Sequence, residues 1–233
     1  NSHLKTVMDF SFFDKVNTAK NEQTDTWFKG LDRVYNNFVY DYLYPNPASV
    51  LAFIENHDTD RFLGEGENLD MLKQASTLLL TTRRIPQLYY GTEVMMNGVK
   101  SKSDGYVRKD FPGGWTDDKE NALTPEGRTR LQNESYNFYR NLLNWRKGND
   151  VIAKGSMKQF MVQHGVYAYA RQYKGKTVFV LLNGTDKEVK LPLKYYAEVL
   201  KDKTQGKDVI SGKVTALNEE LTMAPRQSMV IEL

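Results

Sequence analysis

The 233-residue sequence contains no cysteine. Disulfide bridges, thiol nucleophiles and zinc–thiolate sites are therefore excluded, and the absence fits a periplasmic, cell-surface or cytosolic protein. No apolar run approaches the roughly 20 residues that cross a bilayer, and no segment of this sequence has the pattern of a secretory leader. Asn1 lies just before a strand-like segment, and no initiator methionine precedes it. We therefore expect no membrane span and a chain that begins inside a domain.

Charge of one sign is also scarce, because 32 basic residues stand against 29 acidic ones for a net charge of +3. This balance predicts no surface for polyanions, so nucleic acid is not expected as a partner. A hydrophobic fraction of 40% and a charged fraction of 26% are typical of a globular protein. The length allows one large domain or two ordinary ones. Aromatic residues make up 12% of the sequence, and such rings serve both cores and sugar-binding clefts.

The first 150 residues alternate between strand-like and helix-like segments. Apolar residues recur every three or four positions in some segments, and short apolar runs lie between them. These patterns predict helices over 24–42, 68–82 and 124–147 and strands over 4–10, 49–54 and 87–90. Trp27 and Tyr42 fall on the apolar stripe of the first helix, so we expect both rings to pack on the strands, and a ligand role is the alternative. Alternation of this kind favours parallel strands joined by crossover helices.

Near Asp150 the apolar period changes from about 3.6 residues to about 2. Short strand-like segments separated by turns such as Asn183-Gly184 predict a small antiparallel sandwich. The predicted strands cover 156–162, 166–173, 177–183, 188–191, 197–200, 209–210, 214–216 and 227–233. The predicted fold class is therefore α/β followed by all-β.

A polar segment, Asn56-His57-Asp58, follows the strand-like run 49–54. In a barrel of alternating strands and helices, side chains at the carboxyl ends of the strands converge on the substrate. An amide, an imidazole and a carboxylate would be fixed there by rigid backbone. This segment is the candidate functional site.

At 56–58 the sequence resembles the last conserved region of the α-amylase family of glycoside hydrolases, an Asn-His-Asp after the seventh barrel strand. Segment 85–93 is similar to the family's strand-eight region, and 104–108 is similar to the Asp-Pro-x-x-Arg loop of its neopullulanase and cyclomaltodextrinase branch. Arg84 departs from the pattern, because the family usually has glycine there. The resemblance implies that residues 1–150 are the last three strand–helix units of a TIM (β/α)8 barrel. It implies a C-terminal antiparallel β-sandwich over 151–233.

The resemblance also implies roles for particular residues. Asp58 would be the catalytic carboxylate that stabilises an oxocarbenium-like transition state, and His57 would donate hydrogen bonds to the same sugar. Asp104 and Arg108 would bind the non-reducing side of the glucan chain. The alternatives are a structural histidine at position 57 and an ordinary surface ion pair between Asp104 and Arg108.

Neighbouring polar residues have structural explanations. Asn56 is expected to hold its turn by bonding backbone groups, and Arg61 is expected to pair with Asp60 or another carboxylate. Asp9 and Asp14 lie at or beyond the end of the first strand-like segment. We expect both to be loop residues or helix caps.

Two catalytic groups of the family are missing. The family's nucleophile lies in an Arg-x-Asp motif on strand four and its acid is a glutamate after strand five, but no Arg-x-Asp at a strand end precedes His57. Glu93 matches a family carboxylate that supports the fold, so we predict no catalytic role for it. The chain is therefore expected to begin at strand six and to be inactive by itself.

The resemblance implies a retaining hydrolase of α-1,4-glucans, with cyclodextrins and pullulan as candidate substrates. Its partners would be that substrate and the missing N-terminal part of the barrel. No cofactor is expected in this segment, because no oxygen-rich ligand loop is evident; calcium, where the family binds it, belongs to earlier segments. An incomplete barrel leaves an open sheet edge, which favours pairing with the missing part or self-association into a homo-oligomer. The rival interpretations are a glycosyltransferring homologue, a non-catalytic carbohydrate-binding protein and a homologue that has lost its activity.

Overall fold

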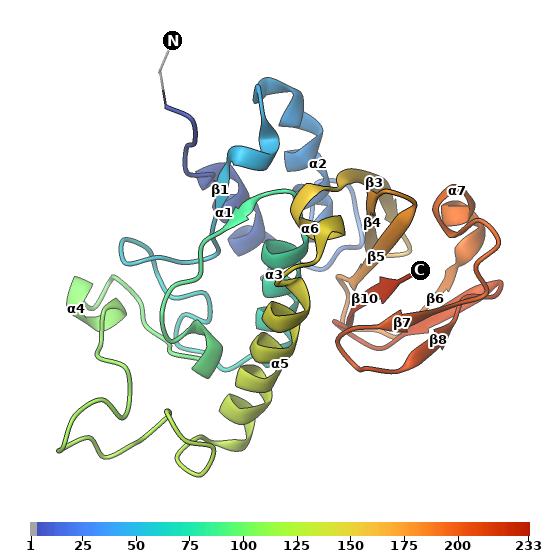
Figure 1. Ribbon diagram of the computed structural model, residues 1–233. Helices are drawn as coiled ribbons and strands as arrows, with labels where there is room; N and C mark the ends of the chain where they lie inside the picture. The colour runs from blue at the N-terminus through green and yellow to red at the C-terminus, as the bar shows by residue number, and fades with distance from the viewer. Residues whose placement is uncertain (1–3) are drawn as a thin grey trace.

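The molecule has a helical first half built around short parallel segments and a second half built on a twisted sheet (Figure 1). The computed structural model describes residues 4–233, so the expectation for Asn1 lies outside the described residues. Met8 forms a parallel bridge with Leu51, and β1 (Leu51–Ala52) pairs in parallel with β2 (Ile85–Pro86). The predicted parallel pairing is confirmed.

The extent of the predicted strands is wrong. The segment 4–10 contributes only the bridge at Met8, and the strand predicted over 49–54 shrinks to the two-residue β1. No strand forms over 87–90, because β2 ends at Pro86, just before that segment. Pro86 has no N–H to donate to a ladder, and Gly91 turns the chain with a φ of 81° soon afterwards.

Helices fill the connections between the parallel segments. Those of the first half are α1 (Phe10–Ala19), α2 (Leu31–Val39), α3 (Leu69–Thr81), α4 (Asp104–Val107) and α5 (Arg130–Arg146). Short 3-10 turns are η1 (Tyr40–Leu43), η2 (Pro47–Ser49) and η3 (Thr92–Val94). The long α5 runs down the centre of the view in Figure 1. Among the described residues, no helix is long and apolar enough to cross a membrane.

Capping groups decide where the long helices begin. Asn68 accepts a hydrogen bond from the Met71 amide at 3.0 Å, so α3 starts where the sequence predicted. The helix predicted from residue 124 starts only after Thr129, because Thr129 and Gln132 form a capping box there. Asp9 caps α1, which confirms the expectation of a capping role, although the helix itself was not predicted. The expectation for Asp14 is wrong, because Asp14 lies inside α1 and is neither a loop residue nor a cap.

The connection from α1 to α2 is a loop fixed by hydrogen bonds, not the start of a helix. The helix predicted over 24–42 begins only at Leu31, because the Thr24 hydroxyl accepts a hydrogen bond from the Leu31 amide at 2.9 Å. The Thr24 N–H donates to the Gly184 carbonyl at 2.9 Å, which ties the loop to the second half of the chain. Gly30 has a φ of 54°, and a Cβ added to it would lie 2.2 Å from the Thr24 hydroxyl.

The prediction that Trp27 and Tyr42 pack on the strands is wrong. Their residues are 68% and 75% exposed. Trp27 lies in the loop before α2 and Tyr42 lies in η1 after it, so neither continues the apolar stripe of the helix. Inside α2 the stripe is present, because Val34 and Phe38 are buried.

The second half forms a two-layered β domain that follows α6 (Asp150–Lys154). Six antiparallel strands lie in the order β3-β4-β5-β10-β7-β8, and β6 pairs with β9 in a second sheet. Their bounds are β3 (Ser156–Gln163), β4 (Val166–Tyr173), β5 (Lys176–Asn183), β6 (Val189–Pro192), β7 (Gln205–Asp208), β8 (Val214–Ala216), β9 (Glu220–Met223) and β10 (Ser228–Glu232). The predicted antiparallel sandwich is confirmed.

One predicted strand is a helix. Residues 197–200 form α7 (Ala197–Leu200), which follows the 3-10 turn η4 (Leu193–Tyr196). Tyr196, Val199 and Leu200 are all buried. Their spacing of three and four residues places them on one side of a helix rather than on one face of a strand. The strand predicted at 209–210 lies just after β7, and β9 was not predicted.

Both faces of the large sheet are buried. Alternate residues such as Tyr167 and Tyr169 pack with α3 and α5, whereas Val166, Ala168 and Ala170 pack with the small sheet and α7. This explains why β4 reads as a continuous apolar run instead of an alternating one.

Arg171 on β4 joins the sheet to the helical half. Its side chain is buried and donates hydrogen bonds at 2.8 Å to the carbonyls of Thr81, Ile152 and Gly155. Burial lowers the pKa of its guanidinium to about 10, so the group is charged at neutral pH. The charge is stabilised by carbonyl dipoles instead of a carboxylate.

We expect Arg171→Met to lower the free energy of unfolding by roughly 3 kcal/mol, because buried carbonyls at the end of α3 and around α6 lose their donor. Urea unfolding followed by circular dichroism measures this loss. Arg171→Lys is the matched control, since lysine keeps the charge but cannot reach all the carbonyls. Its free energy of unfolding should lie between those of Arg171→Met and the wild type. Equal stability of Arg171→Met and the wild type would contradict the assigned role.

Glu22 holds the loop before α2 in place. Its carboxylate accepts hydrogen bonds from the Gly30 amide at 2.8 Å and from Arg33 Nε and Nη2 at 2.7 Å. The hydrogen bond from Arg33 is the main reason that the pKa of Glu22 falls to about 2 from its ordinary 4.5. The ionised form is therefore favoured by folding.

A carboxyl group whose pKa is lowered by folding stabilises the protein above its unfolded pKa and loses that effect as the pH falls toward its folded pKa. We expect Glu22→Gln to be less stable than the wild type at pH 6. The difference in stability between the wild type and Glu22→Gln should narrow as the pH falls from 4.5 toward 2. Urea midpoints at pH 6 and pH 3 measure it, and a gap of constant size would contradict the prediction.

Candidate active site

A tight turn follows β1 and carries the predicted site residues. Asn56 is buried, and its side-chain oxygen accepts a hydrogen bond from the Asp58 amide at 2.8 Å. The Asn56 N–H donates to the Thr59 hydroxyl at 3.0 Å. The prediction that Asn56 holds this turn is confirmed. As a result, His57 and Asp58 stand at the tip of the turn, with side chains 62% and 61% exposed.

The turn is closed beneath its tip by a buried ion pair. Arg61 Nη1 lies 3.3 Å from Glu55 Oε1, and both side chains are buried. The Glu55 carboxylate also accepts hydrogen bonds from the Phe62 amide and the Thr92 hydroxyl. Burial raises the pKa of Glu55, while these donors and Arg61 act in the opposite direction. Arg61 therefore pairs with Glu55 and not with Asp60. A pair with another carboxylate was one of the two outcomes expected for Arg61.

Arg61 also reaches the segment that follows β2. It donates to the Tyr90 carbonyl at 2.7 Å and to the Val107 carbonyl at 3.1 Å, and its guanidinium lies 3.9 Å from the centre of the Tyr89 ring. Its own N–H donates to the Gly98 carbonyl at 3.0 Å. One buried side chain thus orients the loops after β1 and β2 relative to each other.

The four predicted site residues lie together in one cluster. Arg108 Nη2 lies 2.9 Å from Asp58 Oδ1 and 3.3 Å from Asp104 Oδ2. His57 Nε2 lies 3.2 Å from Asp58 Oδ2. Arg108 Nε also donates to the His57 carbonyl at 2.8 Å. Both carboxylate oxygens of Asp58 therefore face nitrogen atoms of the protein.

Lys100 belongs to the same cluster and was not predicted. Its Nζ donates to the Asp58 carbonyl at 3.0 Å and lies 3.3 Å from Asp104 Oδ1, and its N–H donates to Asp60 at 2.6 Å. A lysine in a loop rich in lysine and serine gives no signal in the sequence. The position of Lys100 becomes evident only when the loop after β2 packs against the loop after β1.

The cluster combines oppositely charged groups at an exposed rim. The cations of Lys100 and Arg108 lie beside the carboxylates of Asp58 and Asp104, so their charges balance. Hydroxyl groups of a bound molecule can replace ion-pair partners at such a rim, because exposed ion pairs are weak. Within residues 4–233, no group of three or more metal-binding side chains is present.

Other acidic residues of the first half lie outside this cluster. Asp9 caps α1 and forms a buried ion pair with Arg84 at 3.0 Å, and Arg84 also pairs with Asp41. This explains why an arginine occupies that position: the turn before β2 is built around two buried carboxylates. Glu93 lies in η3, which packs against α5. Its supporting role stays a prediction.

Comparison with known proteins identifies relatives of the chain. Residues 157–232 match the family of cyclomaltodextrinase C-terminal domains. The chain is 29% identical over 220 residues to an α-amylase of Niallia circulans, covering 91% of this chain and 38% of that protein. It is 32% identical over 177 residues to a cyclomaltodextrin glucanotransferase of Thermoanaerobacterium thermosulfurigenes, covering 76% of this chain and 22% of that protein. The chain thus spans less than two fifths of the length of these relatives.

A solved structure shares the fold. An α-amylase from Geobacillus thermoleovorans, complexed with acarbose, matches with a TM-score of 0.76 at 19% identity over 98% of this chain and 48% of that chain. At this identity the match concerns the arrangement of helices and strands alone. That arrangement therefore extends over both halves of the molecule.

We expect Arg61→Met to lower the free energy of unfolding by about 3–5 kcal/mol, because it leaves the Glu55 carboxylate buried without its cation. Chemical unfolding of the single variants and of the double variant with Glu55→Gln forms a double-mutant cycle. The double variant should recover part of the loss. Strictly additive effects would contradict a coupled pair.

Proposed function

The chain is a homologue of α-amylases and cyclomaltodextrin glucanotransferases, matching a carboxy-terminal portion of such enzymes, and from this premise we propose that it is part of a retaining α-glucan hydrolase. Residues 1–150 supply the last three strand–helix units of a catalytic (β/α)8 barrel. Residues 151–233 form its C-terminal β-sandwich domain. The substrates are α-1,4-linked glucans.

The convergence of Asp58, His57, Asp104 and Arg108 carries this proposal. These residues come from two loops, one after β1 and one after β2, and lie within hydrogen-bonding or ion-pairing distance of one another. Both loops follow the carboxyl ends of parallel strands, where barrel enzymes place their substrates. An ordinary surface pair between Asp104 and Arg108 would not require Asp58 to join it.

Asp58 is assigned the carboxylate that stabilises the transition state. Positive charge develops near the anomeric carbon during glycoside hydrolysis, and a fixed carboxylate lowers its energy. His57 lies beside Asp58 and presents an imidazole to the same sugar. The Asn56 turn and the buried Glu55–Arg61 pair hold both residues in position.

Arg108 and Asp104 are assigned to the glucan chain. Arg108 shares its Nη2 between Asp58 and Asp104. An arriving sugar hydroxyl replaces or shares the guanidinium at Asp58, and Arg108 keeps its contact with Asp104. Lys100 holds Asp104 from the other side.

The nucleophilic aspartate and the acidic glutamate are assigned to a part of the protein outside this sequence, which spans less than two fifths of its curated relatives. Apolar side chains exposed around the parallel segments support a covering partner there: Leu4, Val7, Met8, Phe10 and Ile85. The missing part of the barrel is that partner, and self-association of this surface is the alternative.

Glycosyl transfer is the second candidate activity. Several relatives are cyclomaltodextrin glucanotransferases, among them the one that is 32% identical. Transfer and hydrolysis differ in whether a sugar hydroxyl or water accepts the glycosyl group. The same carboxylate at Asp58 serves both.

We expect Asp58→Asn in the whole protein to reduce turnover of soluble starch by roughly three orders of magnitude with little change in stability, because an amide cannot balance the developing charge. Reducing-end release measures turnover. Asp14→Asn is the matched control, since the Asp14 side chain is also 61% exposed and pairs with the neighbouring Lys15. An active Asp58→Asn enzyme, or turnover by the 233 residues alone, would refute the assignment.

A further inference from the structure

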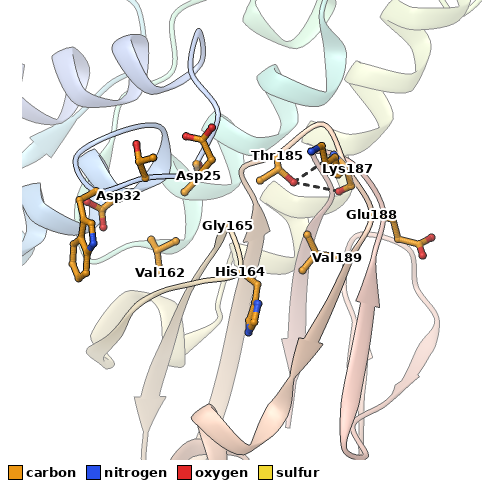
Figure 2. A pocket seen from close by; sticks show the side chains of 12 residues that line it. Asp25, Asp32, Val162, His164, Gly165, Thr185, Lys187, Glu188 and Val189 are labelled. Atoms are coloured by element: carbon orange, nitrogen blue, oxygen red, sulfur yellow. Dashed lines mark hydrogen bonds between the residues drawn. The ribbon is translucent and has the colours of Figure 1, made fainter.

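A cavity of about 580 Å³ lies between the loop before α2 and the β domain, and none of its lining residues belongs to the Asp58 cluster. Figure 2 shows Asp25 and Asp32 on the side of the loop and His164, Thr185 and Lys187 on the side of the β domain. Its volume falls in the range of ligand pockets.

The loop that forms one wall presents aromatic rings to solvent. Trp27 lines the cavity, and Trp27 and Phe28 are 68% and 64% exposed. Phe28 has a φ of 59°, a backbone conformation that is costly for a bulky residue. The Asp32 carboxylate holds it there by accepting a hydrogen bond from the Phe28 amide at 2.6 Å.

The loop is rigid as well as exposed. The Thr24 bond to Gly184 and the Glu22 bonds to Gly30 and Arg33 fix both of its ends. A strained segment persists only where its surroundings enforce it, and such segments cluster at ligand sites. Trp27 is therefore held in place without packing into the core, which is the arrangement of a binding platform.

The chemistry of the walls selects a class of ligand. The carboxylates of Asp25, Asp32 and Glu188 outnumber the amine of Lys187, which disfavours anions. No cluster of three or more metal-binding side chains occurs among residues 4–233, and a cation cage needs more than one ring. Over the same described part of the chain, the side chains of Asp25, His164 and Lys187 make no hydrogen bond or ion pair, so their polar atoms are free for a ligand.

A neutral ligand with one apolar face and many hydroxyl groups fits such walls. We propose that this cavity is a second, non-catalytic saccharide site, in which the Trp27 ring stacks on a pyranose and Asp25, His164 and Lys187 bind its hydroxyls. Only the choice of an α-1,4-glucan as the saccharide rests on the proposed function. The site holds a glucan chain to the molecule beside the β domain, away from the catalytic rim.

The test compares Trp27→Ala with the wild type in the whole protein. Adsorption to insoluble starch should weaken at least fivefold, whereas turnover of maltotriose should stay unchanged. Trp115→Ala is the matched control, because Trp115 is 67% exposed in another loop and does not line the cavity. Adsorption by this control should match the wild type. An unchanged unfolding midpoint shows that Trp27→Ala is folded.

Unchanged adsorption of Trp27→Ala, or an equal loss in Trp115→Ala, would overturn the second site. Failure of the proposed function is separate, because it appears as absent turnover of every α-glucan by the wild type. Adsorption is measured without turnover. In that case a fivefold loss specific to Trp27→Ala still supports the saccharide site.

Discussion

The geometry of the site depends on the buried contacts of the Arg61 guanidinium. This group pairs with Glu55 beneath the Asn56 turn and also donates to the carbonyls of Tyr90 and Val107. Val107 immediately precedes Arg108, so the side chain that fixes the loop carrying Asp58 also fixes the loop carrying its ion-pair partner. A buried charge is costly unless it is paired, so the loops are held where Arg61 keeps its contacts with Glu55 and the two carbonyls.

The residues that hold the site loops in place are therefore different from the residues exposed at the tip of the turn. The ion pair that holds the loops is buried, where a low dielectric makes each hydrogen bond strong. The residues proposed to bind a sugar are exposed, where their ion pairs are weak and exchange easily. With a buried ion pair below it and exchangeable partners around it, the proposed binding of sugar hydroxyls by Asp58 does not require the turn that carries it to move.

The sequence predicted the parts of the molecule whose signals are local. Residues 56–58 at a strand end, the cap at Asn68 and the change to a period of about two near residue 150 were sufficient for the site loop, α3 and the sandwich. Lys100 was not predictable, because its contacts come from a loop docking far along the chain. Trp27 was misplaced because the hydrogen bonds that the backbone amides of Thr24 and Gly30 donate to Gly184 and Glu22 override the helical spacing around it.

The large sheet is covered on both faces, by α3 and α5 on one side and by the small sheet on the other. The region 157–232 that matches a domain family therefore shares its hydrophobic core with helices that lie outside it. Substitutions at Tyr167 or Tyr169 alter the surface on which those helices rest. In evolutionary terms, the β domain and the helical half are expected to covary across residue 150, because neither can change its side of the shared core independently.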